Sequence, residues 1–480
     1  MPTHSRQYRS EIPALPDELY AWHDRDGAFE RLTPPWAQTS IVASSGTMKP
    51  GDRKKLRVTM GPMHVNWTIE HEAIDGRGFA DVQRSGPFAS WRHEHRFRDT
   101  EIDTCSLEDS LTYALPADRL ASGIVGARID DRLDRVFGFR HIRTAQDLSR
   151  HRSFRDGPLR IAVTGATGLV GRNLIAFLKT GGHAVLPIVR RSIGDPHEIR
   201  WDPAAGSIDA AALEGCDAVI HLAGESIANG RWTAARKRAI LSSRIDGTRL
   251  LANSLATLKH PPDVFVSASA VGFYGNRGDE ILAETASRGS GFLADVCEAW
   301  EAAAAPAAAA GIRVVHPRLG VVVAGEGGML PKLLPLFRLG IAGRIASGNQ
   351  YMSWIGIDDL LGLLLAIVQD ARFRGPVNAV SPQPVTNKEF TRLLASILHR
   401  PARIPLPAPA IRLTVGEMAD ALLLASQRAI PAKLEDARFP FFFAHIEDAL
   451  RFELGAIDNA FRARMLLKLD TNTRVGLEHQ

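Results

Sequence analysis

The spacing of apolar and polar residues changes near residue 159. Before that point, short runs such as 56–60 and 65–69 alternate apolar with polar side chains, which is typical of strands with one buried face. After it, largely apolar runs such as 159–163 alternate with stretches of helical spacing, which predicts buried parallel strands joined by helices. The pattern therefore predicts an α+β domain followed by an α/β domain with a doubly wound parallel sheet.

Residues 1–145 are expected to form the α+β domain. Helical starts near 16–22 and 28–32 precede the alternating runs, and a helix over about 129–144 closes the domain. This order suggests a helix-grip arrangement, in which a cavity between sheet and helix suits an apolar ligand. The histidines of its strand-like runs raise the question of a metal site, but we expect them on a solvent-facing side of the sheet and predict no metal; they are His64, His71, His93 and His95.

The remaining boundaries follow from composition. Residues 146–158 belong to a polar, charged stretch and are predicted to be a linker. Residues 159–456 are predicted to form one Rossmann domain, whose helical end begins at about 400. Residues 457–480 show no clear packing role and are predicted to be a tail.

A glycine-rich turn is the strongest candidate site. Gly165, Gly168 and Gly171 follow the strand 159–163 and open a helical stretch, which is the context of a dinucleotide-binding loop. The helix N-terminus would offer free N–H groups to a pyrophosphate. An ordinary tight turn is the alternative interpretation, but the strand before and the helix after favour dinucleotide binding.

The end of the next strand, 183–189, indicates which dinucleotide is preferred. NAD sites usually carry Asp or Glu here, to accept hydrogen bonds from the ribose hydroxyls. This chain instead has Arg190 and Arg191. A guanidinium suits a 2′-phosphate, so NADP(H) is predicted. The alternative is that the arginines are simply solvent-exposed residues at the end of the strand.

Two further strands are predicted to end beside the cofactor, because the carboxyl ends of parallel strands line the ligand crevice. The first leads into Leu222, Ala223, Gly224 and Glu225. Glu225 could reach a ribose or substrate hydroxyl, or it could be a surface acid. The second strand carries Ser267 and Ser269, which would face the nicotinamide. Ser269 is a candidate partner for a reacting carbonyl or hydroxyl, and Tyr274 is a candidate proton donor or relay.

Composition narrows the class of protein. The 480 residues are 45% hydrophobic and 23% charged, with a net charge of +5, which is ordinary for a soluble globular protein. No dense basic tract is interleaved with aromatic residues, so no nucleic-acid partner is expected. No apolar run is long enough for a membrane span or signal peptide, and the three cysteines lie far apart, so a reducing, cytoplasmic location is expected. The oligomeric state is not predicted.

Several segments together resemble the epimerase-like family of atypical short-chain dehydrogenase/reductases. They are GATGLVG at 165–171, HLAGESIANGRW at 221–232, SSRIDGT at 242–248, SASAVGFYG at 267–275, GFLADVCEAWEAAA at 291–304, LLPLFRLGIAG at 333–343, YMSWIGIDDL at 351–360 and GEMAD at 416–420. Members are often labelled nucleoside-diphosphate-sugar epimerase and sometimes cell-division inhibitor, a label that these residues do not support physically. Some members carry a START-like, polyketide-cyclase-like ligand-binding domain at the N-terminus, which fits residues 1–145.

The resemblance implies a Rossmann fold with bound NADP(H). It places Arg190 at the 2′-phosphate, Leu222 and Ala223 along the adenosine side, and Arg244 in the region that closes on the cofactor. The residues that it places at the pyrophosphate are Gly165, Thr167, Gly168, Leu169, Val170 and Gly171.

The chain departs from the wider superfamily in its acid/base residues. Active members carry Tyr-x-x-x-Lys on the helix expected at 291–310, but alignment on Glu301 puts Leu293 and Cys297 at those positions. Neither can replace the pair. Two functions therefore remain open. One is an NADP(H)-dependent oxidoreductase or epimerase that acts on a small-molecule substrate through Ser269 and Tyr274. The other is a non-catalytic NADP(H)-binding sensor coupled to an apolar-ligand domain.

Overall fold

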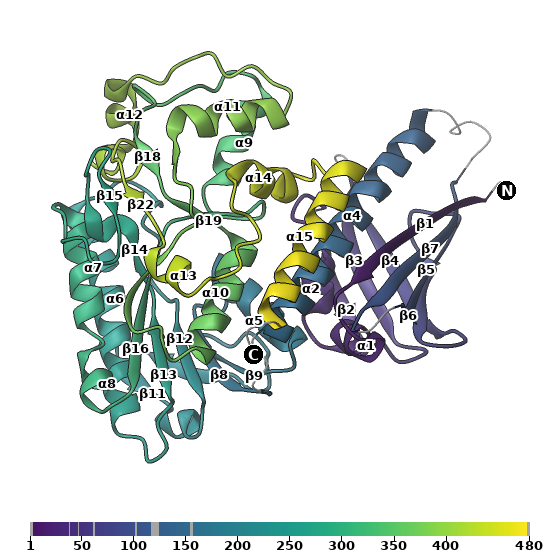
Figure 1. Cartoon of the computed structure of the whole chain (residues 1–480), viewed down its shortest axis with the longest axis horizontal. Helices are drawn as coiled ribbons and strands as arrows, with labels where there is room; N and C mark the ends of the chain where they lie inside the picture. Colours follow the sequence, from purple (N-terminus) through teal and green to yellow (C-terminus); the bar gives the residue numbers. More distant parts are fainter. Residues whose placement is uncertain are drawn as a thin grey trace. The chain divides into compact units, whose positions relative to one another are not determined.

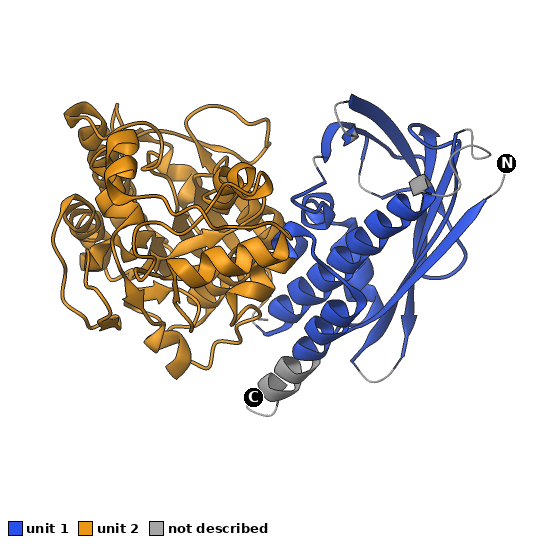
Figure 2. Ribbon diagram, turned by 90° about the horizontal axis from the view of Figure 1, so that it is seen from above, with its two compact units in different colours: residues 1–155, 179–182, 452–480 blue, residues 156–178, 183–451 orange. Residues whose placement is uncertain are grey.

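The computed structural model describes residues 3–37, 39–46, 48–60, 63–100, 103–116, 124–153 and 157–477 of the chain. These residues form two compact units (Figure 2). Unit 1 comprises residues 1–155, 179–182 and 452–480, and unit 2 comprises residues 156–178 and 183–451. No helix among the described residues is both long and apolar enough to cross a membrane.

Unit 1 is built on a seven-stranded antiparallel sheet with the order β1-β7-β6-β5-β4-β3-β2 (Figure 1). Two short helices, α1 (Pro16–Asp24) and α2 (Ala28–Leu32), follow β1, and the long helix α4 (Ile124–Ser153) follows β7. This is the predicted succession of short helices, antiparallel sheet and closing helix. The strands are β1 (His4–Ile12), β2 (Thr39–Ser44), β3 (Arg53–Met60), β4 (Met63–Ala73), β5 (Gly78–Ser85), β6 (Ser90–Asp99) and β7 (Cys105–Ala114).

Helix α4 packs on the face of the sheet that carries the buried aromatic side chains. Phe137 of α4 stacks on Tyr8 of β1 with ring centroids 4.5 Å apart, in a core that also holds Trp91, Leu111 and Tyr113. The strands bury alternate residues because successive side chains point to opposite faces of a sheet.

The predicted linker begins too early. Helix α4 extends to Ser153, so residues 146–153 are helical. Their polar side chains suggested an exposed connection, but Asp147 and Arg31 form a doubly hydrogen-bonded ion pair at 2.6 and 2.7 Å in which both side chains are buried. A polar segment can pack when its charges are paired inside the fold.

The predicted tail is also wrong for the residues that the structure describes. Residues 459–477 form helix α15, which packs against α4 within unit 1 (Figures 1 and 2). Phe461, Met465 and Leu469 are buried, and their four-residue spacing places them on one side of the helix. That spacing was the sequence signal for a packed helix.

Unit 2 contains the predicted doubly wound sheet. Its nine strands are ordered β11-β10-β9-β8-β12-β13-β16-β14, and β20 also pairs with β16. Every pairing is parallel except that of β11 with β10. The strands are β8 (Arg160–Thr164), β9 (Ala184–Val189), β10 (Ile199–Asp202), β11 (Ser207–Ile208), β12 (Ala218–His221), β13 (Val264–Ser267), β14 (Ser269–Ala270), β16 (Arg313–Leu319) and β20 (Gly375–Ala379).

The order of the strands creates a switch point between β8 and β12. The chain leaves β8 through α5 (Leu169–Thr180) to reach β9 on one side, and β12 pairs with β8 on the other. Ligands of open α/β sheets bind beyond the carboxyl ends of the strands at such a point. The other connections of the sheet contain α6 (Ala234–Ala256), α7 (Phe292–Ala302), α8 (Ala305–Ala309) and α10 (Ile357–Gln369).

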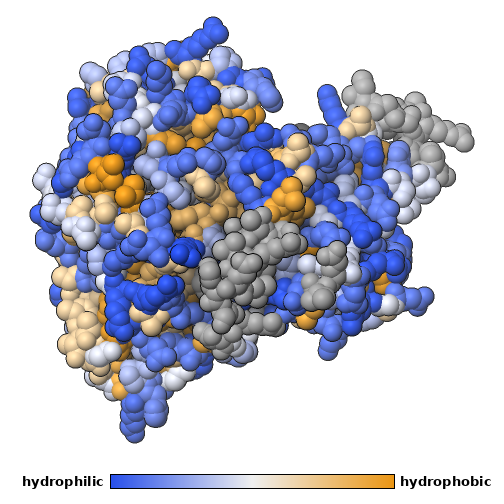
Figure 3. All heavy atoms as spheres, in the orientation of Figure 1, coloured by the Kyte–Doolittle hydropathy of each residue, from blue (hydrophilic) through white to orange (hydrophobic). Residues whose placement is uncertain are grey.

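The remainder of unit 2 consists of helices and small strand pairs. Its strand pairs are β15 (Ile281–Leu282) with β22 (Arg428–Ala429), β17 (Val321–Val323) with β19 (Trp354–Gly356), and β18 (Tyr351–Met352) with β21 (Val385–Thr386). Its helices are α9 (Leu330–Arg338), α11 (Asn387–Ile397), α12 (Ala408–Val415), α13 (Ala432–Asp436) and most of α14 (Ile446–Leu454), which continues into unit 1 after residue 451. Its short helical turns are η1 (Ala210–Leu213), η2 (Val271–Tyr274) and η3 (Ala419–Leu423). On the face shown in Figure 3, hydrophilic residues predominate and hydrophobic ones form separate small patches.

Candidate functional site

The glycine-rich loop requires glycine at two of its positions. Gly165 has a φ of +72°, and a Cβ there would lie 3.0 Å from the backbone of Leu222. A Cβ on Gly171 would collide with the carbonyl oxygen of Gly165. The loop therefore closes tightly on the end of β12 and on the first turn of α5, and it presents backbone at the switch point.

One cavity of about 510 Å³ joins this loop to the rest of unit 2. The loop contributes Gly165, Gly168, Leu169, Val170 and Gly171, and the end of β12 contributes Leu222 and Gly224. On the far side the cavity is lined by residues from the segments that follow β16, among them Met329, Tyr351, Asn387 and Gln427. The predicted cofactor loop and the predicted substrate-side region therefore share one space.

Thr164, the last residue of β8, ties the two central strands together at this edge. Its hydroxyl oxygen accepts hydrogen bonds from the backbone N–H groups of Leu222 (3.0 Å) and Ala223 (3.1 Å). The same oxygen lies 2.7 Å from Nδ1 of His221, whose pKa is lowered to about 3 by burial. These bonds hold Leu222 and Ala223 next to the loop, where Leu222 lines the cavity and Ala223 does not.

Arg244 of α6 lines the cavity. Its Nη1 donates to the carbonyl oxygens of Glu225 (3.0 Å) and Ile240 (3.1 Å), and its guanidinium carbon lies 4.9 Å from the centre of the Trp300 ring. Burial lowers the pKa of Arg244. Its ordinary pKa is so high that the group stays cationic near neutral pH, so the cavity has a fixed positive charge in its wall.

Ser269 also lines the cavity, and it begins a buried polar network. The Ser269 hydroxyl donates to Glu301 (2.7 Å), whose two oxygens also accept bonds from Nε (2.8 Å) and Nη2 (2.9 Å) of Arg318. Nη1 of Arg318 donates to the hydroxyl oxygen of Tyr274 (3.0 Å), and this hydroxyl donates to Oδ1 of Asn378 (2.7 Å). The network runs from the cavity into the core.

The structure separates Tyr274 and Ser267 from the cavity. Both side chains are fully buried, and neither belongs to the cavity lining. Burial raises the pKa of Tyr274. Its hydroxyl already has two partners in the core, so it does not lie where the sequence interpretation placed a direct proton donor. The reason is the turn η2, which directs Tyr274 toward Asn378 of β20.

The positions of the missing acid/base pair face the cavity. Leu293 and Cys297 of α7 both line it, and both lie near Gly272. Burial raises the pKa of the Cys297 thiol to about 11, so the thiol stays protonated at neutral pH. The positions that carry the Tyr and Lys pair in active members therefore face the cavity, but the side chains present cannot act as that acid/base pair.

Besides Ala223, Tyr274 and Ser267, four predicted residues lie outside the lining of the cavity. Thr167, Arg190 and Arg191 are exposed, and neither arginine pairs with a carboxylate among the described residues. Glu225 forms an ion pair with Arg236 (2.8 Å). This contact makes Glu225 a partner of the neighbouring helix α6.

Sequence reasoning missed Tyr351 as a site residue. It lines the cavity and its hydroxyl forms no hydrogen bond with any described residue, while Arg428 lies over its ring at 4.8 Å from the centre. The only available signal was its position at the start of the segment YMSWIGIDDL. Alternation and helical spacing do not reveal it, because the cavity wall here is a loop and a two-residue strand.

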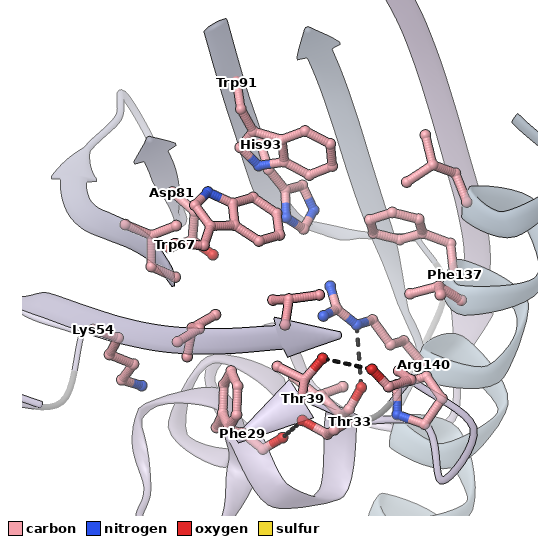
Figure 4. A pocket seen from close by; sticks show the side chains of 18 of the residues that line it. Phe29, Thr33, Thr39, Lys54, Trp67, Asp81, Trp91, His93, Phe137 and Arg140 are labelled. Atoms are coloured by element: carbon pink, nitrogen blue, oxygen red, sulfur yellow. Dashed lines mark hydrogen bonds between the residues drawn. The ribbon is translucent and has the colours of Figure 1, made fainter. Parts of the chain in front are cut away.

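Unit 1 contains a second cavity, of about 420 Å³ (Figure 4). Figure 4 shows the indole rings of Trp67 and Trp91 on the sheet side, and Phe137 and Arg140 on helix α4. Most of the other lining residues are apolar, including Phe29, Leu56, Ile69 and Leu133. The cavity predicted between sheet and helix is thus present.

The histidines of unit 1 do not lie as expected. His71, His93 and His95 are buried and line this cavity, whereas only His64 is exposed among the four. The alternation of β6 explains the difference, because His93 and His95 share their face with the buried Trp91 and Phe97. Burial lowers the pKa of His93 to about 4; burial also opposes charge on His95, but Asp109 and Asp81 raise its pKa to about 9.

Comparisons with known proteins agree with the geometry of unit 2. The model of the NAD dependent epimerase/dehydratase family matches residues 161–379, and a domain of unknown function, DUF1731, matches residues 406–453. The Epimerase family protein MT2273 of Mycobacterium tuberculosis is 43% identical over 292 residues, which cover 61% of this chain and 96% of the relative. The human Epimerase family protein SDR39U1 is 33% identical over 299 residues, which cover 61% of this chain and 99% of the relative.

Two solved structures extend the comparison. The crystal structure of the nucleoside-diphosphate sugar epimerase from Corynebacterium glutamicum is 33% identical, with a TM-score of 0.77, and the match covers 99% of both chains. The crystal structure of human epimerase family protein SDR39U1 (isoform 2) with NADPH is 33% identical, with a TM-score of 0.56, over 61% of this chain and 98% of the other. The first likeness therefore spans both units, and the second spans about the length of unit 2.

Proposed function

Because the chain belongs to the epimerase family, we propose that unit 2 is an NADP(H)-dependent oxidoreductase or epimerase acting on a small molecule. The observation that carries this proposal is the single cavity in which the glycine-rich loop, Ser269 and Tyr351 all take part. A nicotinamide dinucleotide supplies the hydride acceptor or donor for oxidation or reduction at a carbon that bears oxygen. The chain must then bind the dinucleotide, hold the substrate, and accept or donate the proton of the reacting oxygen.

The residues present fit a dinucleotide. The backbone of the loop faces the cavity without side chains at Gly165 and Gly168, and helix α5 begins directly behind it at Leu169. This geometry suits a pyrophosphate, which the N–H groups of a helix N-terminus bind well. The exposed Arg190, which directly follows β9, supports the choice of NADP(H), because a guanidinium there would pair with the 2′-phosphate. The human relative was crystallised with NADPH, which agrees with this choice.

Ser269 is the proposed contact for the reacting oxygen of the substrate. Ser269 is the polar residue of strand β14 that lines the cavity, and Glu301 holds its hydroxyl by a 2.7 Å hydrogen bond. Tyr274 takes a positioning role, because it acts on Ser269 only through Arg318 and Glu301. Tyr351 offers a second hydroxyl on the substrate side of the cavity.

The direct test is cofactor binding by the full-length chain. We expect native mass spectrometry of the gently purified protein to detect bound NADP(H), and titration of the cofactor-free protein to show tighter binding of NADPH than of NADH. A chain that neither retains nor takes up NADPH would overturn the proposal, because the loop would then be only a structural turn. Equal affinity for both dinucleotides would contradict only the assignment of Arg190 to the 2′-phosphate.

A sensor is the second candidate, and two observations favour it. Leu293 and Cys297 replace the usual acid/base pair, and unit 1 has its own apolar cavity. In this alternative, unit 1 is a START-like ligand-binding domain of helix-grip form and unit 2 binds NADP(H) without turnover. Screening small carbonyl compounds and sugar nucleotides for NADPH consumption separates the candidates. Turnover of any substrate excludes the purely non-catalytic sensor.

A further inference from the structure

We propose that unit 1 binds a divalent transition-metal ion through Asp81, His93 and His95, in the wall of its apolar cavity. One ligand atom from each of these side chains lies within 4.8 Å of the other two. All three residues line the cavity, and Figure 4 shows Asp81 and His93 on the sheet side of it. This inference concerns unit 1 alone and does not depend on dinucleotide binding by unit 2.

The antiparallel sheet brings the three side chains together. His93 and His95 are two residues apart on β6, so both point to the buried face of the sheet. Asp81 on β5 is the direct cross-strand partner of His93. Side chains opposite each other on adjacent strands are neighbours, so the pairing of β5 with β6 builds the group without a loop. Ligands on paired strands are more rigid than ligands on a loop.

A second carboxylate, that of Asp109, contacts both imidazoles. Oδ1 of Asp109, on β7, lies 3.0 Å from Nε2 of His93 and 2.7 Å from Nδ1 of His95. The contact with His93 is a hydrogen bond, whereas the contact with His95 lacks hydrogen-bond geometry. Nε2 of His95 lies 3.6 Å from Oδ2 of Asp81, so this nitrogen and Asp81 can share an ion with the second nitrogen of His93. Histidine ligands of metals commonly hold a carboxylate with their second nitrogen in this way, which fixes the tautomer and the orientation of the ring.

Asp109 is itself held by residues that lie further from the proposed ligands. Its Oδ2 lies 2.7 Å from Nε2 of His141 on α4, and Nδ1 of His141 lies 2.8 Å from the hydroxyl oxygen of Ser10. Arg462 of α15 donates to the same Ser10 oxygen at 2.6 Å. Helix α15, which was predicted to be a tail, thus helps to hold the residues that contact Asp109.

Polar atoms around the three ligands lack partners. His71 is buried in the same cavity wall, and its Nε2 has no hydrogen-bond partner among the described residues. Its Nδ1 lies 2.7 Å from Oδ1 of Asp81, in a geometry that is not a normal hydrogen bond. Buried polar atoms without partners destabilise the fold, and an ion with its bound water would provide partners for these atoms.

The donor set indicates the class of metal and of cavity ligand. Two imidazoles and one carboxylate suit Zn²⁺, Fe²⁺ or Co²⁺, whereas Mg²⁺ and Ca²⁺ prefer oxygen donors. Three protein ligands leave coordination positions open on the side of the cavity. The apolar lining around them fits a molecule with an apolar body and an oxygen donor at one end.

The test is metal binding by the full-length chain after treatment with a chelator. We expect one equivalent of Zn²⁺ per chain by elemental mass spectrometry, and a visible Co²⁺ spectrum typical of nitrogen and oxygen ligands. His93→Ala and His95→Ala should remove this equivalent. Asp109→Asn should keep the ligands but weaken Co²⁺ binding by about 10- to 100-fold. His64→Ala, on β4 but exposed, is the matched control and should bind as the unchanged protein does.

The alternative is a self-contained ion-pair network in which His95 bridges Asp81 and Asp109 without a metal. A chain that takes up neither Zn²⁺ nor Co²⁺ would establish that alternative and overturn the proposal. Retention of the full equivalent by both His93→Ala and His95→Ala would also overturn it. Circular dichroism and thermal unfolding of each variant detect misfolding. If an alanine variant misfolds, Asp81→Asn, which keeps the size of the side chain, decides the question by losing or keeping the equivalent.

Discussion

The hydroxyl of Ser269 donates a 2.7 Å hydrogen bond to Oε1 of Glu301. Arg318 holds both oxygens of the same carboxylate, so Glu301 has little freedom to turn away from the serine. The hydroxyl is therefore fixed in direction at the wall of the cavity. Because Glu301 takes its single hydrogen, the hydroxyl presents its oxygen lone pairs and can accept a hydrogen bond from a substrate hydroxyl without reorganisation.

Ser269→Ala should lower kcat by about 100-fold or more, and leave the Kd for NADPH nearly unchanged. The change removes the proposed contact with the reacting oxygen but leaves the glycine-rich loop intact. NADPH consumption with a substrate found by screening measures the first effect, and NADPH titration measures the second. Ser207→Ala, on the exposed edge strand β11, is the control and should retain full activity. Full activity of Ser269→Ala would show that the serine has no catalytic part.

Tyr274→Phe should have a smaller effect on kcat, of about several-fold, and should lower the free energy of unfolding by about 1–3 kcal/mol. The variant leaves Oδ1 of Asn378 and Nη1 of Arg318 without their partner in the core. Urea denaturation measures the stability. The pH profile of kcat distinguishes the roles, because a positioning residue leaves its shape unchanged. Loss of one limb of that profile would instead make Tyr274 a proton donor.

The sequence predicted the parts of the fold that depend on local periodicity. The glycine spacing and the apolar run before Gly165 identified the loop, and the alternation of strands and helices in unit 2 predicted its parallel sheet. The boundaries at 146–153 and 459–477 were missed because Asp147 is polar yet paired with Arg31, and because Phe461 and Met465 belong to a short helical pattern at the chain end. Pairing between distant residues leaves no local signature.

The sequence predicted only part of the candidate site, because it reveals local periodicity but not pairing between distant residues. Ser269 and Leu222 lie at strand ends, so parallel topology alone brings them to the crevice. Tyr274 lies only five residues after Ser269, but it ends the turn η2 and its hydroxyl bonds to Asn378 in the core, which no periodic rule predicts. His93 was assigned to the solvent face because polar residues are usually exposed. Its burial depends on Asp109, which is distant in sequence but on the paired strand β7.

Arg190→Ala should weaken NADPH binding by about 10- to 100-fold and change NADH binding by less than about 2-fold. A charged hydrogen-bonded contact with a phosphate contributes about 1.5–3 kcal/mol, and NADH has no 2′-phosphate. Titration of both dinucleotides measures the difference. Arg238→Ala, exposed on α6, removes the same charge elsewhere and should leave both affinities unchanged. Equal losses for NADPH and NADH would contradict the proposed role of Arg190.

His221→Asn should reduce the loss of stability that the protein shows as the pH falls below about 6.5. Burial lowers the pKa of His221 from 6.5 to about 3, so the folded state holds the ring neutral while the unfolded state takes up a proton. A cationic ring would have to donate from Nδ1 to the Thr164 oxygen, which already accepts two N–H groups. The contribution of His221 is therefore complete above about pH 6.5 and decreases by up to about 1.4 kcal/mol per pH unit below it.

Urea denaturation at several pH values between about 5 and 8 measures this effect as the slope of the unfolding free energy against pH. Asn keeps an acceptor near the position of Nδ1 but does not titrate, so the slope below about pH 6.5 should be shallower in the variant. His197→Asn, in the exposed loop before β10, should keep the slope of the unchanged protein. An unchanged slope in His221→Asn would mean that the ring is protonated equally in both states. The bond to Thr164 would then not depend on a neutral His221, and the edge formed by β8 and β12 would tolerate a charge beside the glycine-rich loop.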